Sequence, residues 1–194
     1  MPIVIAGGQS VTDYTVEDLT FLCRFGFVFA VNDSCFKYPC DVVVACDYKW
    51  IVAHAEQLKK LDKPIITRKW DGLEKCGLQV YFIPNESVRQ YPLSGMVACK
   101  ISDKMAATVE KKSYVIGMDA TAGHYYDDTG RADRIDVGVY EKMGLTNTVN
   151  LGIHSRISCW PKASKLPHPR KVLVHATYRV VAAAWACGNP GAHL

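Results

Sequence analysis

Residues 2–10 read Pro-Ile-Val-Ile-Ala-Gly-Gly-Gln-Ser. The small or branched apolar residues at the start of this stretch predict a strand that is buried on both faces. The two glycines that follow it, Gly7 and Gly8, allow backbone N–H groups to come close to a ligand, and a glycine turn after a strand is where an open α/β sheet usually receives a phosphate. The alternative is a tight turn that only needs positive φ. The stretch is neither Gly-x-Gly-x-x-Gly nor a Walker loop, so any nucleotide here is held in another way.

Length and composition favour one domain. The chain has 194 residues, of which 49% are hydrophobic, enough for one sizeable core. No apolar run reaches the roughly 18 residues that span a bilayer, and the start lacks the basic region of a signal peptide. We therefore expect a cytoplasmic protein without a membrane span. The eight cysteines lie mostly in apolar segments without zinc-ligand spacing, which predicts reduced core thiols and no zinc site.

Charge is distributed unevenly along the chain. The net charge is +4, and no acidic residue follows Glu141. We divide the chain into a nucleotide-binding domain, residues 1–162, and a basic extension, residues 163–194, with a short helix near 177–187. The positive charge favours an anionic ligand or a nucleic acid near this part, and a solvated basic tail is the alternative.

Buried strands and helices alternate along the chain. Such βαβ units make the sheet parallel and its crossovers right-handed. The sequence predicts an α/β fold, a Rossmann-like three-layer sandwich with a mostly parallel sheet and the first strand central. The expected strands are 2–6, 27–31, 41–46, 63–67, 78–83, 113–118 and 148–151, and the expected helices follow Thr15 and cover about 50–61, 94–105 and 133–143.

Polar residues gather at the carboxyl ends of these strands and at one helix start. Ser94 is a predicted N-cap, and Ser94-Gly95 opens a helix whose free N–H groups suit an anion. His54 lies on the apolar stripe of its helix and is interpreted as a core or boundary histidine. The residues predicted to bind a nucleotide are Gly7, Gly8, Gln9, Ser10, Asn32, Asp33, Asp47, Ser94, Gly95, Asp119, Asn150 and Ser155.

The order of these pieces resembles a group of Rossmann-like proteins that includes single-domain bacterial sialyltransferases, the hydroxymethylpterin diphosphokinase-like family and small phage proteins. The matching motifs are Ala6-Gly-Gly-Gln-Ser10, Val31-Asn32, Ala45-Cys-Asp47, Ser94-Gly95, Gly117-Met-Asp119 with His124, Val149-Asn-Leu-Gly-Ile-His-Ser155 and Trp160-Pro161. The resemblance covers roughly residues 2–162. Gln9 departs from it where the pattern prefers proline, and Tyr125-Tyr-Asp-Asp replaces a second histidine.

The resemblance implies a chemistry. Sialyltransferases of this group bind a cytidine monophosphate sugar, use a histidine as base and hold the leaving phosphate with tyrosines. Carried onto this chain, His124 or His154 is the base, and Tyr125 and Tyr126 contact the phosphate. The diphosphokinase-like relatives suggest Mg²⁺ at acidic residues, although transfer does not require a metal and solvated loop carboxylates are the alternative. The carboxylates in question are Asp47, Asp119, Asp127 and Asp128.

Two functions follow as hypotheses. The first is a transferase that uses a nucleotide-activated donor, most simply a glycosyltransferase with a histidine base and an unknown acceptor. The second is a non-catalytic phage protein, in the host cytoplasm, that sequesters a host nucleotide signal. A nucleic-acid partner for the basic extension and self-association through its short helix are further expectations. Gly8→Val should abolish nucleotide binding with little loss of folding.

Overall fold

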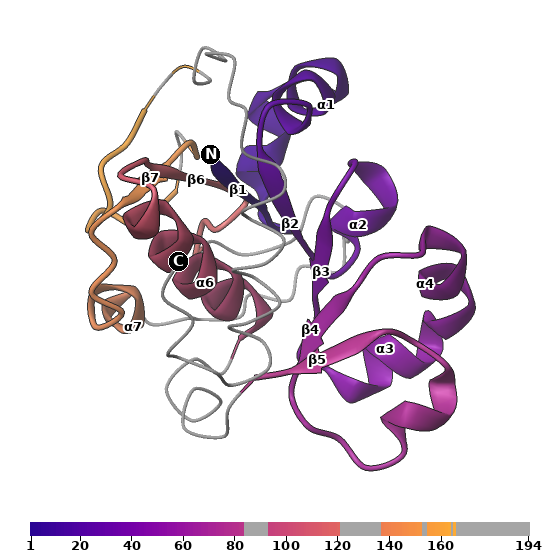
Figure 1. The fold of residues 1–194 in the computed structure, drawn as a ribbon. Coiled ribbons are helices and arrows are strands. Elements are labelled where there is room, and N and C mark those ends of the chain that lie inside the picture. Colours follow the sequence, from indigo (N-terminus) through magenta and orange to yellow (C-terminus); the bar gives the residue numbers. More distant parts are fainter. Residues whose placement is uncertain (84–92, 121–136, 153–154, 164, 166–194) are drawn as a thin grey trace.

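A computed structural model describes residues 1–83, 93–120, 137–152, 155–163 and 165. In it seven strands form one sheet in the order β5-β4-β3-β2-β1-β6-β7, and every neighbouring pair is parallel (Figure 1). The fold is therefore α/β, as predicted. The strands are β1 (Pro2–Ile5), β2 (Phe27–Val31), β3 (Val42–Val44), β4 (Ile65–Thr67), β5 (Val80–Phe82), β6 (Ser113–Ile116) and β7 (Thr148–Asn150).

Helices cover both faces of the sheet, which gives three layers (Figure 1). One face packs against α6 and α7, and the other against α1 to α4 and the 3-10 helix η2. A second 3-10 helix, η1, lies between β1 and α1. The bounds are η1 (Gln9–Asp13), α1 (Val16–Cys23), α2 (Ser34–Lys37), α3 (Tyr48–Ala53), α4 (Ala55–Leu61), η2 (Leu73–Cys76), α6 (Ser94–Thr108) and α7 (Gly138–Glu141).

β1 lies inside the sheet, between β2 and β6 and one place from the middle strand. Its central residues Ile3, Val4 and Ile5 are completely buried. Ile3 and Ile5 face one helical layer and Val4 faces the other, because successive side chains of a strand alternate. A strand covered on both sides needs an uninterrupted apolar run, which explains the first residues of the chain.

The order of the strands creates a switch point between β1 and β6. From β1 the chain builds outward to β5, and it then returns through α6 to place β6 on the other side of β1. The connections after β1 and β6 therefore leave the same edge in opposite directions. In open α/β sheets ligands bind outside the carboxyl ends of the strands at such a point.

Local signals predicted some helix boundaries and missed others. Thr15 and Asp18 form the expected capping box of α1. The single helix expected over 50–61 is instead two helices, α3 and α4, joined at His54 with φ −106° and ψ 11°. α7 is shorter than the predicted 133–143 helix, of which residues 133–136 lie outside the described part, as does the helix near 177–187.

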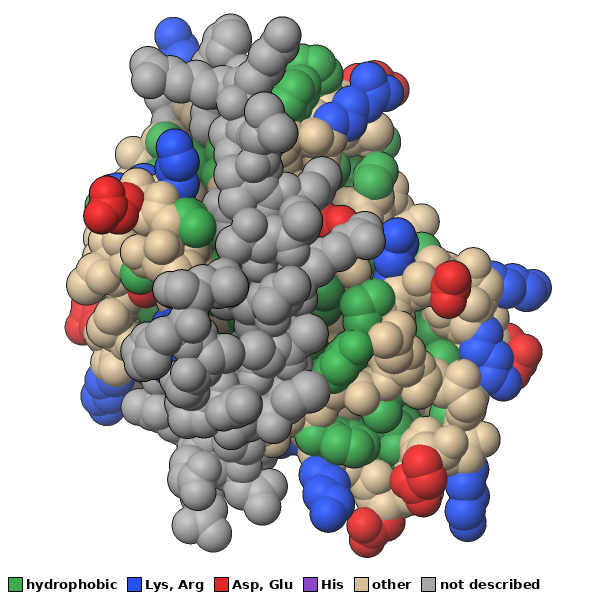
Figure 2. Space-filling view, viewed as in Figure 1, with side chains coloured by type: hydrophobic (Ala, Val, Ile, Leu, Met, Phe, Trp, Pro, Cys, Tyr) green, Lys and Arg blue, Asp and Glu red, His purple; other side chains and the backbone are tan. Residues whose placement is uncertain are grey.

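The surface of the described residues carries both signs of charge. Figure 2 shows Lys and Arg side chains interspersed with Asp and Glu, and hydrophobic side chains exposed between them over the α3 and β5 part of this face. Five of the seven described cysteines are buried, and all seven are free. Within the described ranges, no helix combines the length and apolar character that a bilayer crossing needs.

Candidate functional site

Asp119 and Ser10 form a buried clasp at the switch point. Asp119 follows β6 and Ser10 follows β1, and the two side chains are 5% and 3% exposed. The Asp119 carboxylate accepts the Ser10 backbone N–H at 2.6 Å and the Ser10 hydroxyl at 2.5 Å. Ser10 Oγ in turn accepts the N–H of Gly117 at 3.1 Å. The clasp joins two segments 109 residues apart, so both predicted site residues hold the sheet edge together.

Glycine is needed at position 8 because the clasp lies against its backbone. A Cβ atom on Gly8 would come within 2.5 Å of Gly117 O and 2.6 Å of Asp119 Oδ2. Gly8 has φ −70°, and its N–H donates to Gly117 O at 2.7 Å. The alternative of a tight turn with positive φ therefore does not hold for Gly8, and the Gly8 N–H is not available to a phosphate. The close approach that the sequence indicated is real, but the protein itself fills the space.

The polar residues after β7 also bond to the protein. Asn150 is fully buried, donates through Nδ2 to Ser155 Oγ at 2.9 Å and accepts the Gly152 N–H at 2.9 Å. Ser155 Oγ donates to the Met118 carbonyl at 3.0 Å. These two predicted binding residues therefore shape the turn after β7 and fasten it to the residue before Asp119. Of the other two predicted residues of the first turn, Gly7 is buried and Gln9 is exposed at the start of η1.

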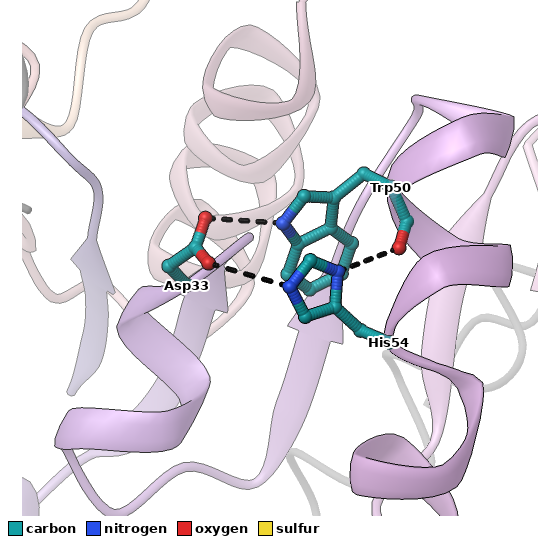
Figure 3. A network of polar contacts seen from close by, with 3 residues as sticks. All are labelled: Asp33, Trp50 and His54. Carbon is teal, nitrogen blue, oxygen red and sulfur yellow. Dashed lines mark hydrogen bonds and ion pairs between the residues drawn. The ribbon is translucent and has the colours of Figure 1, made fainter. Parts of the chain in front are cut away.

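Asp33, the second residue after the middle strand β2, contacts an aromatic cluster (Figure 3). Its carboxylate accepts the Trp50 indole N–H at 3.0 Å and lies 3.9 Å from His54 Nε2. The Trp50 and His54 rings are stacked with centroids 4.5 Å apart, and Phe36 stacks on both. His54 is half-buried, as expected of a boundary histidine. Both Asp33 oxygens face α3, so this residue supports the α2 to α3 contact.

Asp47 caps a helix. Its Oδ1 accepts the backbone N–H of Lys49 at 2.8 Å and that of Trp50 at 3.3 Å, at the start of α3. Among the residues that the structure describes, no three His, Cys, Asp or Glu side chains are placed to hold a metal ion. Asp47 caps α3, whereas Asp119 forms the clasp with Ser10. The remaining carboxylates proposed for Mg²⁺, Asp127 and Asp128, lie outside the described residues.

The first turn of α6 opens at the same edge. Ser94 is the first helical residue and Leu93 the N-cap, so the N-cap prediction for Ser94 is wrong. The Ser94 hydroxyl instead accepts the Cys46 N–H at 2.8 Å, just beyond β3. Gly95 lies against Met118, because a Cβ there would come within 2.8 Å of Met118 Cε. The helix therefore begins between the ends of β3 and β6, as an anion-binding helix start would require.

Arg68 is a candidate that the sequence interpretation missed. It follows β4 directly, and its Nε is buried without a hydrogen-bond partner. Burial raises the pKa of the Cys46 thiol, and the charge of Arg68 together with hydrogen bonds from Ser94 and Arg68 opposes this rise. Arg68 therefore contacts the residue that also binds the start of α6. A basic residue immediately after a predicted strand was the available signal.

Other buried polar atoms without partners lie at or near the ends of β2 and β4. They are Asn32 Oδ1, after β2, and Thr67 Oγ1 and Trp70 Nε1, within and after β4. Asn32 has φ 49°, a left-handed conformation that asparagine tolerates. A buried donor or acceptor left without a partner costs about 1–3 kcal/mol. Such a concentration at one sheet edge calls for an explanation such as a ligand or ordered water.

The predicted catalytic residues His124, Tyr125, Tyr126 and His154 lie outside the described residues. The structure describes the ends of the two segments that contain them, at Ala120 and Val137 and at Gly152 and Ser155. No family model matches the chain, and no curated protein or solved structure matches it either. The class that the fold defines, an α/β protein with a parallel Rossmann-like sheet, therefore rests on the sheet and its edge alone.

Proposed function

We propose that this protein is a transferase that uses a nucleotide-activated donor, with a glycosyl group as the transferred unit and a histidine as general base. The donor binds at the carboxyl edge of the sheet, near the switch point. The support comes from the strand order, from the start of α6 at that edge and from the resemblance to single-domain sialyltransferases.

One observation carries the proposal. The two segments that contain His124 and His154 leave the sheet from the same place. Asp119 precedes the first segment, and its carbonyl accepts the Arg156 N–H, just after the second, at 2.9 Å. A Cβ on Gly152, just before the second segment, would come within 2.8 Å of Asp119 Oδ1. The described ends of the two segments, which carry histidines 30 positions apart in the chain, therefore meet at one point of the edge.

The chemistry fits such an arrangement. A histidine titrates near neutral pH and can take the proton from an acceptor hydroxyl as the bond to the transferred group forms. The bond from that group to the donor phosphate breaks, and its electrons remain on the departing nucleotide. Tyrosine hydroxyls and backbone N–H groups stabilise the charge that grows on the phosphate. Tyr125 and Tyr126 follow His124 directly in the sequence, and we propose that their hydroxyls donate hydrogen bonds to this phosphate.

Single-turnover transfer and donor hydrolysis at saturating donor test the proposal. We expect His124→Ala to lower the rate by about 10²-fold or more, with donor affinity changed only a few-fold, because general base catalysis contributes on that scale. His154→Ala is the second variant for the same role. His54→Ala is the matched control, since it removes a histidine whose contacts with Trp50 and Asp33 lie in α3 and α2, and its rate should stay within about twofold of wild type.

The second candidate is the non-catalytic nucleotide-binding protein. It is favoured by the hydrogen bonds that Asp33, Asp47 and Asp119 make within the protein, because these are the described carboxylates that the sequence predicted at the binding edge. A nucleotide that binds tightly and is returned intact from wild type across a broad donor panel would select this candidate. Full activity in both histidine variants would rule out a histidine base.

A further inference from the structure

Three of the buried polar atoms without partners belong to Asn32, Thr67 and Arg68, at the ends of β2 and β4, the two strands that flank β3. Asn32 N–H donates to Val44 O at 3.2 Å, and Ala45 N–H donates to Ile66 O at 3.0 Å. These bonds align the ends of β2, β3 and β4, so Asn32 and Thr67 flank the end of β3. Thr67 is completely buried, with its hydroxyl unpartnered, and Arg68 comes next in the chain.

The start of α6 lies against the chain just beyond β3, the middle one of these three strands. Cys46, the second residue after β3, donates its N–H to Ser94 Oγ at 2.8 Å. The first backbone bond of the helix runs from Val97 N–H to Leu93 O, so the N–H groups of residues 94–96 precede it and have no partner inside the helix. The first turn of α6 contains no acidic residue. The positive end of a fifteen-residue helix and a guanidinium group therefore lie at one place.

The donors and acceptors of this place define a ligand chemistry. Arg68 Nε and the first N–H groups of α6 can all donate, which suits the oxygens of a phosphate. The Thr67 hydroxyl is not part of this set, because Ile66 packs in the α6 layer and the next residue of the strand faces the other layer. Asn32 Oδ1 can only accept, so its partner in a ligand would be a hydroxyl or an amine. Within the described ranges, the ion pairs His54–Asp33 and Lys59–Glu56 leave Arg68 without a carboxylate partner.

We propose that Arg68 and the first turn of α6 bind a phosphate group of the ligand, and that Asn32 accepts a hydrogen bond from a hydroxyl next to it. The site would take the phosphate and the adjoining sugar of a phosphorylated molecule. The inference rests on the proposed function in that it names where the donor phosphate binds, but it requires no catalysis.

Pyrophosphate is the first probe, measured by titration calorimetry and by thermal melting of the full chain. Wild type should bind it and melt at a rising temperature as its concentration increases, since a ligand that binds only the folded state stabilises it. Arg68→Met should weaken binding by about tenfold or more and abolish the rise, with Arg68→Lys intermediate. Lys69→Met, which removes one charge from the exposed neighbouring residue, should change binding by less than about twofold.

The unliganded proteins provide a second readout. A guanidinium nitrogen that is buried without a partner destabilises the empty protein, so Arg68→Met should melt no lower than wild type when no phosphate is present. A large loss of melting temperature in Arg68→Met and in Arg68→Lys, with unchanged pyrophosphate binding, would overturn the inference and make Arg68 a structural residue.

A comparison of a nucleoside diphosphate with pyrophosphate then tests whether the site recognises the sugar next to the phosphate. A nucleoside diphosphate that binds more tightly than pyrophosphate, with the gain lost in Asn32→Gly, supports recognition of the adjoining sugar. Equal affinity for both in wild type and in Asn32→Gly would refute the role of Asn32. Donor turnover that persists at the wild-type rate and affinity in Arg68→Met would refute this site while leaving the transferase proposal intact. Pyrophosphate binding that depends on Arg68, without any donor turnover, would support this site and refute the transferase proposal.

Discussion

Asp119 binds both polar groups of Ser10, and its neighbours crowd around that contact. The two hydrogen bonds are 2.6 Å and 2.5 Å long, and the positions where Gly8 and Gly152 would carry a Cβ lie within 3.0 Å of the clasp atoms. A buried carboxylate of this kind needs every donor that it receives, since burial without partners is costly. Residues that the sequence marks as ligand-binding are thus first of all the bonds that close the switch point.

Gly8→Ala tests the packing around this clasp. The added methyl group would lie 2.5 Å from Gly117 O, and neither the backbone nor the buried Asp119 can easily give way. We expect the free energy of unfolding to fall by about 1–3 kcal/mol, measured by urea denaturation. Gln9→Ala, at the exposed next residue, is the control and should stay within about 0.5 kcal/mol of wild type. A stable Gly8→Ala protein that lost only ligand binding would restore Gly8 as a phosphate contact.

α6 is the element that connects the two halves of the sheet. It packs on β1, β2, β3, β6 and β7, and its start is fastened to β3 by the bond from Cys46 to Ser94. Its buried side includes Met96, Val97, Ile101 and Met105, at helical spacing. Because the same turn lies beside Arg68, the position of the proposed phosphate site depends on this bond. Ser94 accepts a hydrogen bond from the chain just beyond β3 and does not cap the helix. This bond fixes where α6 begins.

Ser94→Ala tests this bond. The change removes the acceptor of the Cys46 N–H, a group in a residue that is only 5% exposed. Leaving that donor unpaired should lower the free energy of unfolding by about 1–3 kcal/mol. Thr108→Ala, at the other end of α6, removes a hydroxyl that donates only to the Met105 carbonyl of its own helix, and it should cost less than about 0.5 kcal/mol. Equal losses in the two variants would contradict the special role of Ser94.

At the scale of the whole molecule, local patterns predicted the sheet and non-local contacts decided the site. Apolar β-branched runs such as Ile3 to Ile5 predict buried strands, and Thr15 with Asp18 predicts a helix start, because each signal lies within a few residues. The partners of Ser10 and Ser94 lie 109 and 48 residues away. No periodicity contains such pairings, so the sequence placed these residues at the correct edge without showing that they bond to the protein.

The buried thiols link the core to a property of the whole protein, its stability at alkaline pH. Burial raises the pKa of Cys23 and of Cys40 to about 12, and it raises the pKa of Cys35 and Cys99 as well. In the unfolded chain a thiol titrates near pH 8.5. Between about pH 9 and pH 12 the unfolded state therefore loses protons that the native state keeps. The stability that neutral thiols contribute is complete below this window and is lost as the pH rises through it.

We accordingly expect the free energy of unfolding to fall between pH 9 and pH 11, by up to about 1.4 kcal/mol per pH unit for each buried thiol. Cys35→Ala removes one such group and should flatten the pH dependence measured by urea denaturation at several pH values, whatever it does to stability at pH 7. Cys159→Ala is the control, because this thiol is exposed and its environment changes less on unfolding. Parallel pH profiles for wild type and Cys35→Ala would show that Cys35 is not protected from ionisation in the folded core.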